Sequence, residues 1–230
     1  KGLSKRGHDV SVYTSNMLDL HGNTSLYPGT SVISNITVYY SKSIWHFKTL
    51  FFTPSILLMF SKNLSKYDII HIHDCRSFQG ISAYMFARIK KIPYVYQPHG
   101  SYLFSNLDTT FKKMLKFFLD TLISNKIVRD SSKIIALNQI ELTELKIFGV
   151  PKEKIVIIPN GIDLSSLSEL PQKGLFKKKF GIDADSRIIL FLGRIHEIKG
   201  IDTLIKAFVN IVKSVDKVLL VIVGPDDGFL

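Results

Sequence analysis

Short apolar runs rich in Ile and Val alternate along the chain with longer segments in which apolar residues recur at helical spacing. The short runs predict β-strands at residues 10–13, 32–39, 69–73, 94–97, 133–137, 155–158, 188–192 and 218–223. The longer segments predict helices at residues 54–65, 77–90, 111–128, 139–148 and 201–213. Several strands are apolar on both faces, which is typical of a parallel sheet covered by helices on both sides. The alternation therefore predicts a doubly wound α/β fold.

The alternation breaks between residues 162 and 186. This segment contains a proline, a glycine and three consecutive lysines but no long apolar run, so it predicts a linker with a short helix. A new strand follows from residue 187, and residues 201–213 show the clearest helical spacing of the chain. A second β-α domain is therefore predicted to begin after the linker. Both ends of the sequence are interpreted as cut.

Composition narrows the class of protein. Hydrophobic residues make up 46% of the chain and charged residues 21%, which excludes a disordered or collagen-like sequence. The 30 Lys and Arg outnumber the 19 Asp and Glu to give a net charge of +11, which favours an anionic partner such as a nucleotide phosphate, an acidic lipid surface or a nucleic acid. The single Cys75 cannot form an internal disulfide, and the apolar stretch 50–60 is too short to span a bilayer, so we expect a cytoplasmic protein.

Candidate chemistry lies just after the predicted strands, because ligands of open parallel sheets bind outside the carboxyl ends of their strands. In the strand at 69–73, His71 and His73 share one face, and His73 and Asp74 lie at its carboxyl end. Packing of His71 in the core is an equally good interpretation. A metal site with Cys75 is disfavoured, because ligands at every second residue of an extended strand span too far to surround one ion.

The strand at 94–97 leads into a proline, a histidine and a glycine. Pro98 restricts the backbone and Gly100 permits a tight turn, so His99 is presented between them. This histidine could donate to a sugar hydroxyl or a phosphate, or transfer a proton. A turn histidine bonded to nearby backbone is the alternative.

A turn is predicted at Asn160-Gly161, after the strand at 155–158. The dipeptide alone would indicate no more than a change of direction. Its position at the boundary between two α/β units makes it a candidate for the cleft between domains.

Residues 191–200 combine a strand end, glycines, two cations and a helix start. Gly193 ends the strand, the loop carries Arg194 and Lys199, and the helix begins near Gly200. The free N–H groups and the dipole of a helix N-terminus attract an anion, and a planar guanidinium beside an ammonium suits a diphosphate. Solvated surface charges are the alternative, but the coincidence of these features favours a binding site.

Taken in order, these motifs resemble those of the family 4 glycosyltransferases, which have the GT-B fold. Residues 1–14 resemble the end of the family's first helix and its second strand, and I-H-I-H-D, P-H-G, I-P-N-G-I-D and G-R-x-x-x-x-K-G follow at family-like spacing. The resemblance implies two Rossmann-like, doubly wound domains facing a cleft, the second only partly present. The acceptor-side domain would occupy residues 1–163, without its first strand and most of its first helix. A linker would follow at 164–185 and the start of the donor-nucleotide domain at 186–230.

The resemblance also implies a retaining enzyme that moves a sugar from a nucleotide-sugar donor to a glycan, a lipid-linked acceptor or a small molecule, without an essential metal or other cofactor. Arg194 and Lys199 match cations that hold the donor diphosphate and stabilise the charge of the leaving group. His99 matches a histidine near the transferred sugar, which makes it the third catalytic candidate. The other matched positions are the donor-side residues Gly193, Asn160 and Gly161 and the acceptor-side residues His73 and Asp74.

Two alternatives stay open. A GT-B epimerase of sugar nucleotides would keep the fold and the diphosphate site. A non-enzymatic protein would use its net charge on RNA or a membrane; the basic, amphipathic segment 112–126 could rest on anionic lipid, and such peripheral attachment to the inner face of the membrane is also compatible with catalysis. The sequence has no recognised nucleic-acid motif. The family's glycine-rich loop and its pair of glutamates lie outside the sequence, so the isolated chain is expected to be inactive.

Overall fold

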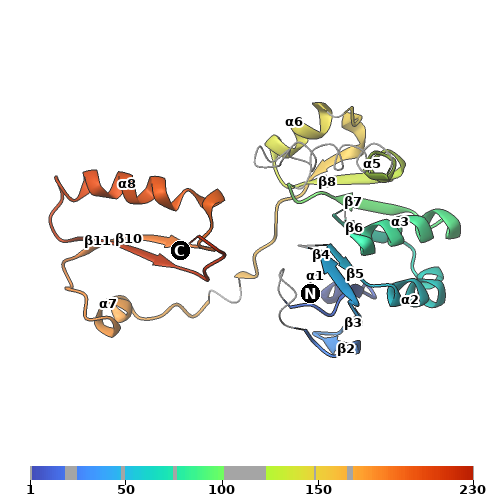
Figure 1. The fold of residues 1–230 in the computed structure, drawn as a ribbon, viewed down its shortest axis with the longest axis horizontal. Helices are drawn as coiled ribbons and strands as arrows, with labels where there is room; N and C mark the ends of the chain where they lie inside the picture. Colours follow the sequence, from blue (N-terminus) through green and yellow to red (C-terminus); the bar gives the residue numbers. More distant parts are fainter. Residues whose placement is uncertain are drawn as a thin grey trace. The chain divides into compact units, whose positions relative to one another are not determined.

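The computed structural model describes residues 2–18, 25–47, 50–74, 77–100, 123–147, 149–164 and 168–229. The chain divides into two compact units, residues 1–161 and residues 162–230. The first unit runs from blue to yellow in Figure 1, and the second is orange to red. Both contain parallel strands packed with helices, so the α/β class predicted from the sequence is confirmed.

A four-stranded parallel sheet forms the centre of the first unit. Its strands lie in the order β6-β7-β8-β9, which is also their order along the chain. Their bounds are β6 Ile70–His73, β7 Tyr94–Gln97, β8 Lys133–Ala136 and β9 Ile155–Ile157. All of them lie within strands predicted from the sequence. Because neighbouring strands are parallel, their carboxyl ends reach one edge of the sheet, and the ends of β6 and β7 lie side by side.

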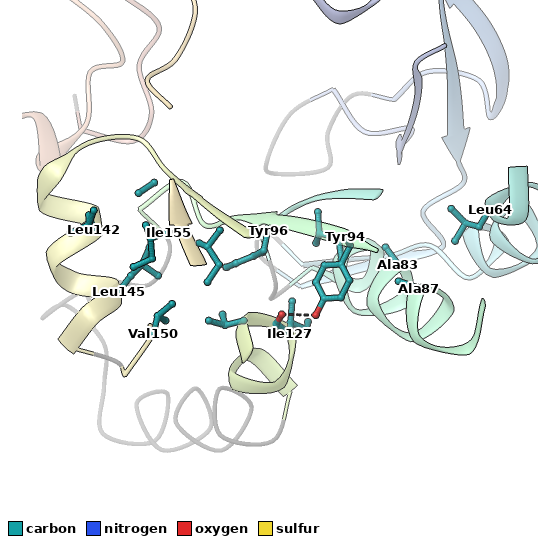
Figure 2. Packing of buried hydrophobic residues seen from close by; sticks show 14 of the residues in the cluster. Leu64, Ala83, Ala87, Tyr94, Tyr96, Ile127, Leu142, Leu145, Val150 and Ile155 are labelled. Carbon is teal, nitrogen blue, oxygen red and sulfur yellow. Dashed lines mark hydrogen bonds between the residues drawn. The ribbon is translucent and has the colours of Figure 1, made fainter. Parts of the chain in front are cut away.

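One cluster of buried apolar side chains joins this sheet to its helices, α3 Phe78–Lys90, α5 Asn125–Asp130 and α6 Gln139–Ile147. Figure 2 shows Leu142 and Leu145 of α6 in this cluster together with Tyr96 of β7. The hydroxyl of Tyr94 donates to the carbonyl oxygen of Ile127 at 2.6 Å, so a polar group inside the core is satisfied (Figure 2). Full burial of each large apolar side chain is worth about 1.5–3 kcal/mol, and this burial holds α5 and α6 on the sheet.

A smaller, mixed sheet contains β1 Ser11–Ser15, β2 Gly29–Ile33 and β3 Ile36–Ser41 in the order β1-β3-β2. The prediction of one strand over residues 32–39 is wrong, because β2 and β3 form an antiparallel hairpin. Ser34 and Asn35 turn the chain with φ values of 51° and 60°, as a type I′ turn requires. The sequence hides this turn, since apolar residues flank it closely and neither turn residue is a glycine.

A second hairpin, β4 Trp45–Phe47 and β5 Leu50–Phe52, was not predicted either. Its strands are shorter than the runs of four to eight residues by which strands are recognised. The predicted helices at 54–65, 77–90 and 139–148 correspond to α2 Ser55–Asn63, α3 and α6. The helix end that the family resemblance implies within residues 1–14 is α1 Gly2–Lys5. Of the predicted helix 111–128, residues 111–122 lie outside the described residues, and α5 begins at Asn125.

In the second unit, β10 Arg187–Leu192 and β11 Val218–Val223 pair in parallel, joined by α8 Ile201–Ile211. Helix α8 runs alongside the two strands (Figure 1), and Ile201 at its start is 2% exposed. The short helix α7 Leu175–Lys179 lies in the segment predicted to hold one, and a 3₁₀ turn, η5 Glu197–Lys199, precedes α8. Among the residues that the structure describes, no helix combines the length and hydropathy needed to cross a membrane.

Candidate functional site

A column of imidazoles stands at the carboxyl edge of the parallel sheet in the first unit. His71 and His73 project from the same face of β6, and their ring centroids are 4.0 Å apart. His99 follows β7 and stacks on His73 with centroids 5.0 Å apart. The Nδ1 atom of His73 lies 2.7 Å from Nε2 of His99, so one ring donates a hydrogen bond and the other accepts it. The structure thus brings together two residues that lie at or just after the ends of consecutive predicted strands.

The surroundings of His73 favour its neutral form. Burial, together with the nearby His71 and His99 rings, lowers the pKa of His73 to about 4. Burial also lowers the pKa of His71, although a hydrogen bond with Gln97 acts in the opposite direction. Both rings keep an accessible edge, yet the protein packed around them removes enough water to make a positive charge unfavourable. His73 is therefore uncharged at neutral pH.

The backbone around His99 is unusual. His99 has a φ of 52° and Gly100 a φ of 73°, so two consecutive residues occupy the left-handed region. Pro98 before them is buried. Such a conformation persists in a non-glycine residue when its surroundings hold it in place, and the N–H of Gly100 is in fact held, because it donates to Oε1 of Glu141 at 2.7 Å.

Asp74 follows His73 with a φ of 61°, and its N–H donates to the carbonyl oxygen of Gln97 at 3.1 Å. The first turn of α3 packs closely on this residue, since a Cβ atom at Gly80 would lie 2.2 Å from the carbonyl oxygen of Asp74. Glycine at position 80 is thus what allows the helix to start against the end of β6. The loop that carries the predicted acceptor-side residues is fixed from both sides.

Glu141 is a residue of this site that the sequence analysis missed. It lies in the first turn of α6 and is 4% exposed. Its Oε2 accepts the N–H of Leu137 at 2.5 Å, and its Oε1 accepts the N–H of Gly100. Its own N–H donates to Oδ1 of Asn138 at 2.9 Å, which makes Asn138 the N-cap of the helix. The signal was present, because an Asn followed three residues later by a Glu is close to the capping-box pattern.

The second unit holds the other candidates. Gly193 donates its N–H to the carbonyl oxygen of Val223, and the loops that follow β10 and β11 continue side by side. In this paired segment, Nη1 of Arg194 donates to Oδ2 of Asp227 at 2.5 Å. The side chain of Arg194 remains 51% exposed, so the guanidinium has a fixed position and still has N–H groups that can reach a ligand.

Lys199 ends the 3₁₀ turn η5, and its side chain is exposed. Gly200 follows with a φ of 64° and is the N-cap of α8, so no side-chain oxygen is present at this position to cap the first turn. Arg194 and Lys199 therefore flank a short turn that leads directly into a helix N-terminus. The arrangement can bind an anion through two cations and backbone N–H groups.

Asn160 and Gly161 lie after β9, exposed, as the last residues of the first unit. Their predicted part in donor binding stays a prediction. The disfavoured metal site includes Cys75, which lies outside the described residues. Within the described ranges, no group of three His, Cys, Asp or Glu is arranged to hold a metal ion.

Each unit matches a model of a glycosyltransferase family. Residues 1–166 match the model of Glycosyltransferase Family 4, and residues 172–229 match that of Glycosyl transferases group 1. The uncharacterized glycosyltransferase MJ1607 of Methanocaldococcus jannaschii is 29% identical over 99% of this chain and 57% of its own length. The alpha-monoglucosyldiacylglycerol synthase of Streptococcus pneumoniae is 27% identical over 96% of the chain and 49% of its own length. The chain thus spans about half the length of these relatives.

Two solved structures resemble the fold. Anabaena HepE in complex with UDP-glucose superposes with a TM-score of 0.59 at 19% identity, over 84% of this chain and 48% of that protein. The catalytic domain of Arabidopsis thaliana starch synthase IV, bound to ADP and acarbose, superposes with a TM-score of 0.64 at 13% identity, over 98% of this chain and 63% of that domain. These likenesses confirm the fold class predicted from the sequence, GT-B with Rossmann-like domains.

Proposed function

The chain belongs to glycosyltransferase family 4, and from this membership we propose that the whole protein transfers a sugar from a nucleotide-sugar donor to a hydroxyl acceptor with retention of configuration. The observation that carries the proposal is the loop after β10, where Arg194 and Lys199 stand on either side of a turn into the N-terminus of α8. This loop binds the donor diphosphate. Residues 1–163 form the acceptor side, residues 164–185 the linker and residues 186–230 the start of the donor side.

The two cations act on the leaving group. As the glycosidic bond breaks, negative charge builds on the departing nucleoside diphosphate, and fixed positive groups stabilise it without having to reorganise. Asp227 holds the guanidinium of Arg194 in one orientation, which lowers the entropic cost of binding. Gly193 lets the loop approach the ligand closely, and Lys199 adds a point charge on the other side of the turn.

His99 acts on the transferred sugar. In the first unit it is held by the strained turn after β7 and by its contact with His73. An imidazole in this position donates one N–H to a sugar hydroxyl or a phosphate oxygen while its other nitrogen is hydrogen-bonded to His73. His73 and Asp74 line the acceptor side, and Asn160 with Gly161, after β9, contributes to donor binding.

The donor class is proposed from the neighbours that bind nucleotides. HepE is described with UDP-glucose, which supports a nucleoside-diphosphate hexose as donor. The acceptor is a glycan, a lipid-linked saccharide or a small molecule, in keeping with relatives as different as the diacylglycerol-modifying enzyme and the D-inositol 3-phosphate glycosyltransferase of Kineococcus radiotolerans. We further propose a role in polysaccharide biosynthesis, catalysis without an essential metal, and a cytoplasmic location with peripheral attachment to the inner face of the membrane.

A thermal-shift experiment on the full-length protein tests the donor site. A panel of nucleoside diphosphates and nucleotide sugars is added, and we expect at least one of them to raise the melting temperature by mass action. The change of both Arg194→Ala and Lys199→Ala should abolish this shift, because the phosphates then lose two charge-assisted contacts.

Lys206→Ala is the matched control, since Lys206 is an exposed cation of α8 that pairs with Asp202 at 3.8 Å. It should leave the ligand-induced shift unchanged. A panel without any stabilising nucleotide, or a double variant that keeps the full shift, contradicts the proposed donor site.

A further inference from the structure

The side chain of Glu141 connects two strand ends that are far apart in the sequence. One carboxylate oxygen accepts the N–H of Gly100 in the turn after β7, at 2.7 Å, and the other accepts the N–H of Leu137 after β8, at 2.5 Å. With 4% of its surface exposed, Glu141 is the most buried of the charged residues in the described part of the chain. A carboxylate in such a place is stabilised by the hydrogen bonds that it accepts and by the dipole of the helix in which it lies.

The helix that carries Glu141 is held firmly in the first unit. Leu142 and Leu145, on the same helix as Glu141, are buried in the core of the first unit (Figure 2). Asn138 caps the helix through the N–H of Glu141. Strands β7 and β8 are themselves neighbours in the sheet, with Tyr96 opposite Ile134. The carboxylate of Glu141 is therefore fixed by its helix, and its hydrogen bond to Gly100 restrains the turn after β7.

That turn carries His99. The N–H that Glu141 binds belongs to Gly100, the second of two consecutive residues in the left-handed region, and the residue before it is His99 itself. A turn of this kind keeps its shape only when contacts from outside hold it. We infer that Glu141 is a positioning residue, which fixes the ring of His99 against His73 and toward the transferred sugar. This inference rests on the proposed function.

A carboxylate is the group that suits this task. It presents two acceptor oxygens to two N–H groups, and charge-assisted bonds of this kind are shorter and stronger than neutral ones. Glutamine would place an NH₂ group against one of the two N–H donors, so one contact would be lost. Aspartate keeps the charge but is one methylene shorter, so it cannot reach both partners without moving the turn.

The test uses Glu141→Gln and Glu141→Asp in the full-length protein. We expect kcat for sugar transfer to fall about ten- to hundred-fold in Glu141→Gln, since a misplacement of roughly 1 Å has an effect of that order, while KM for the donor changes little. Glu141→Asp should be intermediate. Activity is measured well below the melting temperature of every variant, so that the folded fraction is the same.

Glu144→Gln is the control, because it makes the same substitution in the same helix at a partly exposed position. It should keep the wild-type kcat. A Glu141→Gln variant that is folded and equally active would overturn the inference, as would a loss of activity that disappears when the folded fractions are matched.

NMR spectra provide a readout that does not depend on activity. With ¹⁵N-glycine and ¹³C-histidine labels, Glu141→Gln should move the amide signal of Gly100 and the ring signals of His99 and His73, whereas Glu144→Gln should not. If the wild-type protein transfers no sugar, the proposed function fails, and the ring signals alone then decide whether Glu141 positions His99. Unchanged ring signals would contradict it even in an active enzyme.

Discussion

At the scale of single residues, the candidate sites of the two units have one feature in common. In each, a neighbouring side chain sets the position of a candidate functional side chain. His73 holds His99 through a bond between two imidazole nitrogens, and Asp227 holds Arg194 through an ion pair. Each partner reduces the number of orientations that the functional group would otherwise sample in solution. Preorganised groups of this kind stabilise a developing charge more effectively than mobile ones do.

The lowered pKa of His73 predicts how stability depends on pH. Its folded-state pKa of about 4 lies below the ordinary value of 6.5, so between these values the unfolded chain binds more protons than the folded one. The contribution to stability is complete above pH 6.5 and is lost as the pH falls toward 4. The melting temperature should therefore fall across this window, and His73→Gln should reduce the slope.

Thermal unfolding of both proteins between pH 4 and pH 7 measures this slope. His8→Gln serves as control, because it makes the same substitution at an exposed position near the start of the chain, outside the imidazole column. An equal slope in wild type and His73→Gln would show that the imidazole column does not carry the effect.

At the scale of elements, each candidate group lies where a strand ends and a loop must turn sharply. The loops after β10 and β11 are joined by backbone hydrogen bonds between Ile195 and its partners Pro225 and Asp227. This pairing extends the two-stranded sheet beyond its strands. It also carries Arg194, so the position of the cation depends on how closely the two loops approach.

Gly224 permits the close approach of the two loops, and we expect its replacement to lower stability. A Cβ atom at position 224 would lie 1.7 Å from the carbonyl oxygen of Gly193, a backbone atom that cannot turn aside. We expect Gly224→Ala to lower the free energy of unfolding by about 2–4 kcal/mol, in the range of other steric conflicts with the backbone. Urea unfolding measures it.

Gly193→Ala is the comparison, since its Cβ would meet only the ring of Phe191, at 3.6 Å. It should change the midpoint of the urea transition much less than Gly224→Ala does. Equal midpoints for the two variants would mean that the loops separate easily and that their pairing does not position Arg194.

At the scale of the whole molecule, charge is the dominant property. The excess of 30 Lys and Arg over 19 Asp and Glu gives the chain a net charge of +11, and both the proposed donor and the proposed membrane surface are anionic. A field of this sign attracts nucleotide sugars and acidic lipid headgroups alike. Binding to a membrane can be distinguished from binding to a nucleotide sugar, because only the first depends on the charge of the lipid.

The proposed peripheral attachment predicts binding to vesicles of anionic phospholipid but not to vesicles of zwitterionic phospholipid. Raising the salt from about 0.1 M to about 1 M shortens the Debye length from about 10 Å to about 3 Å and should release the protein. Co-sedimentation measures the bound fraction. Binding that is equal on both lipids, or that survives high salt, would contradict an electrostatic attachment.

Much of the fold could be read from local patterns. Strands that are apolar runs between turn signals could be recognised, so β7 in the first unit and β11 in the second match their predicted bounds. The helical period of α8 is also plain in the sequence. The hairpin at Ser34 and Asn35 could not be read in this way, because its turn lacks a glycine and only these two polar residues separate its strands. The short hairpin of β4 and β5 depends on pairing between strands rather than on a local signal.

The sequence by itself determined the class of fold, the family and the places where chemistry is expected, because periodicity and motif spacing are properties of the chain. Tertiary structure decided which of these places meet: that His73 touches His99, that Asp227 holds Arg194, and that Glu141 reaches Gly100 across 41 residues. Contacts of this kind depend on strand order and on the burial of a charged group. Strand order and this burial are determined only when the core packs, because a carboxylate can be buried without a large free-energy cost only where hydrogen-bond donors surround it.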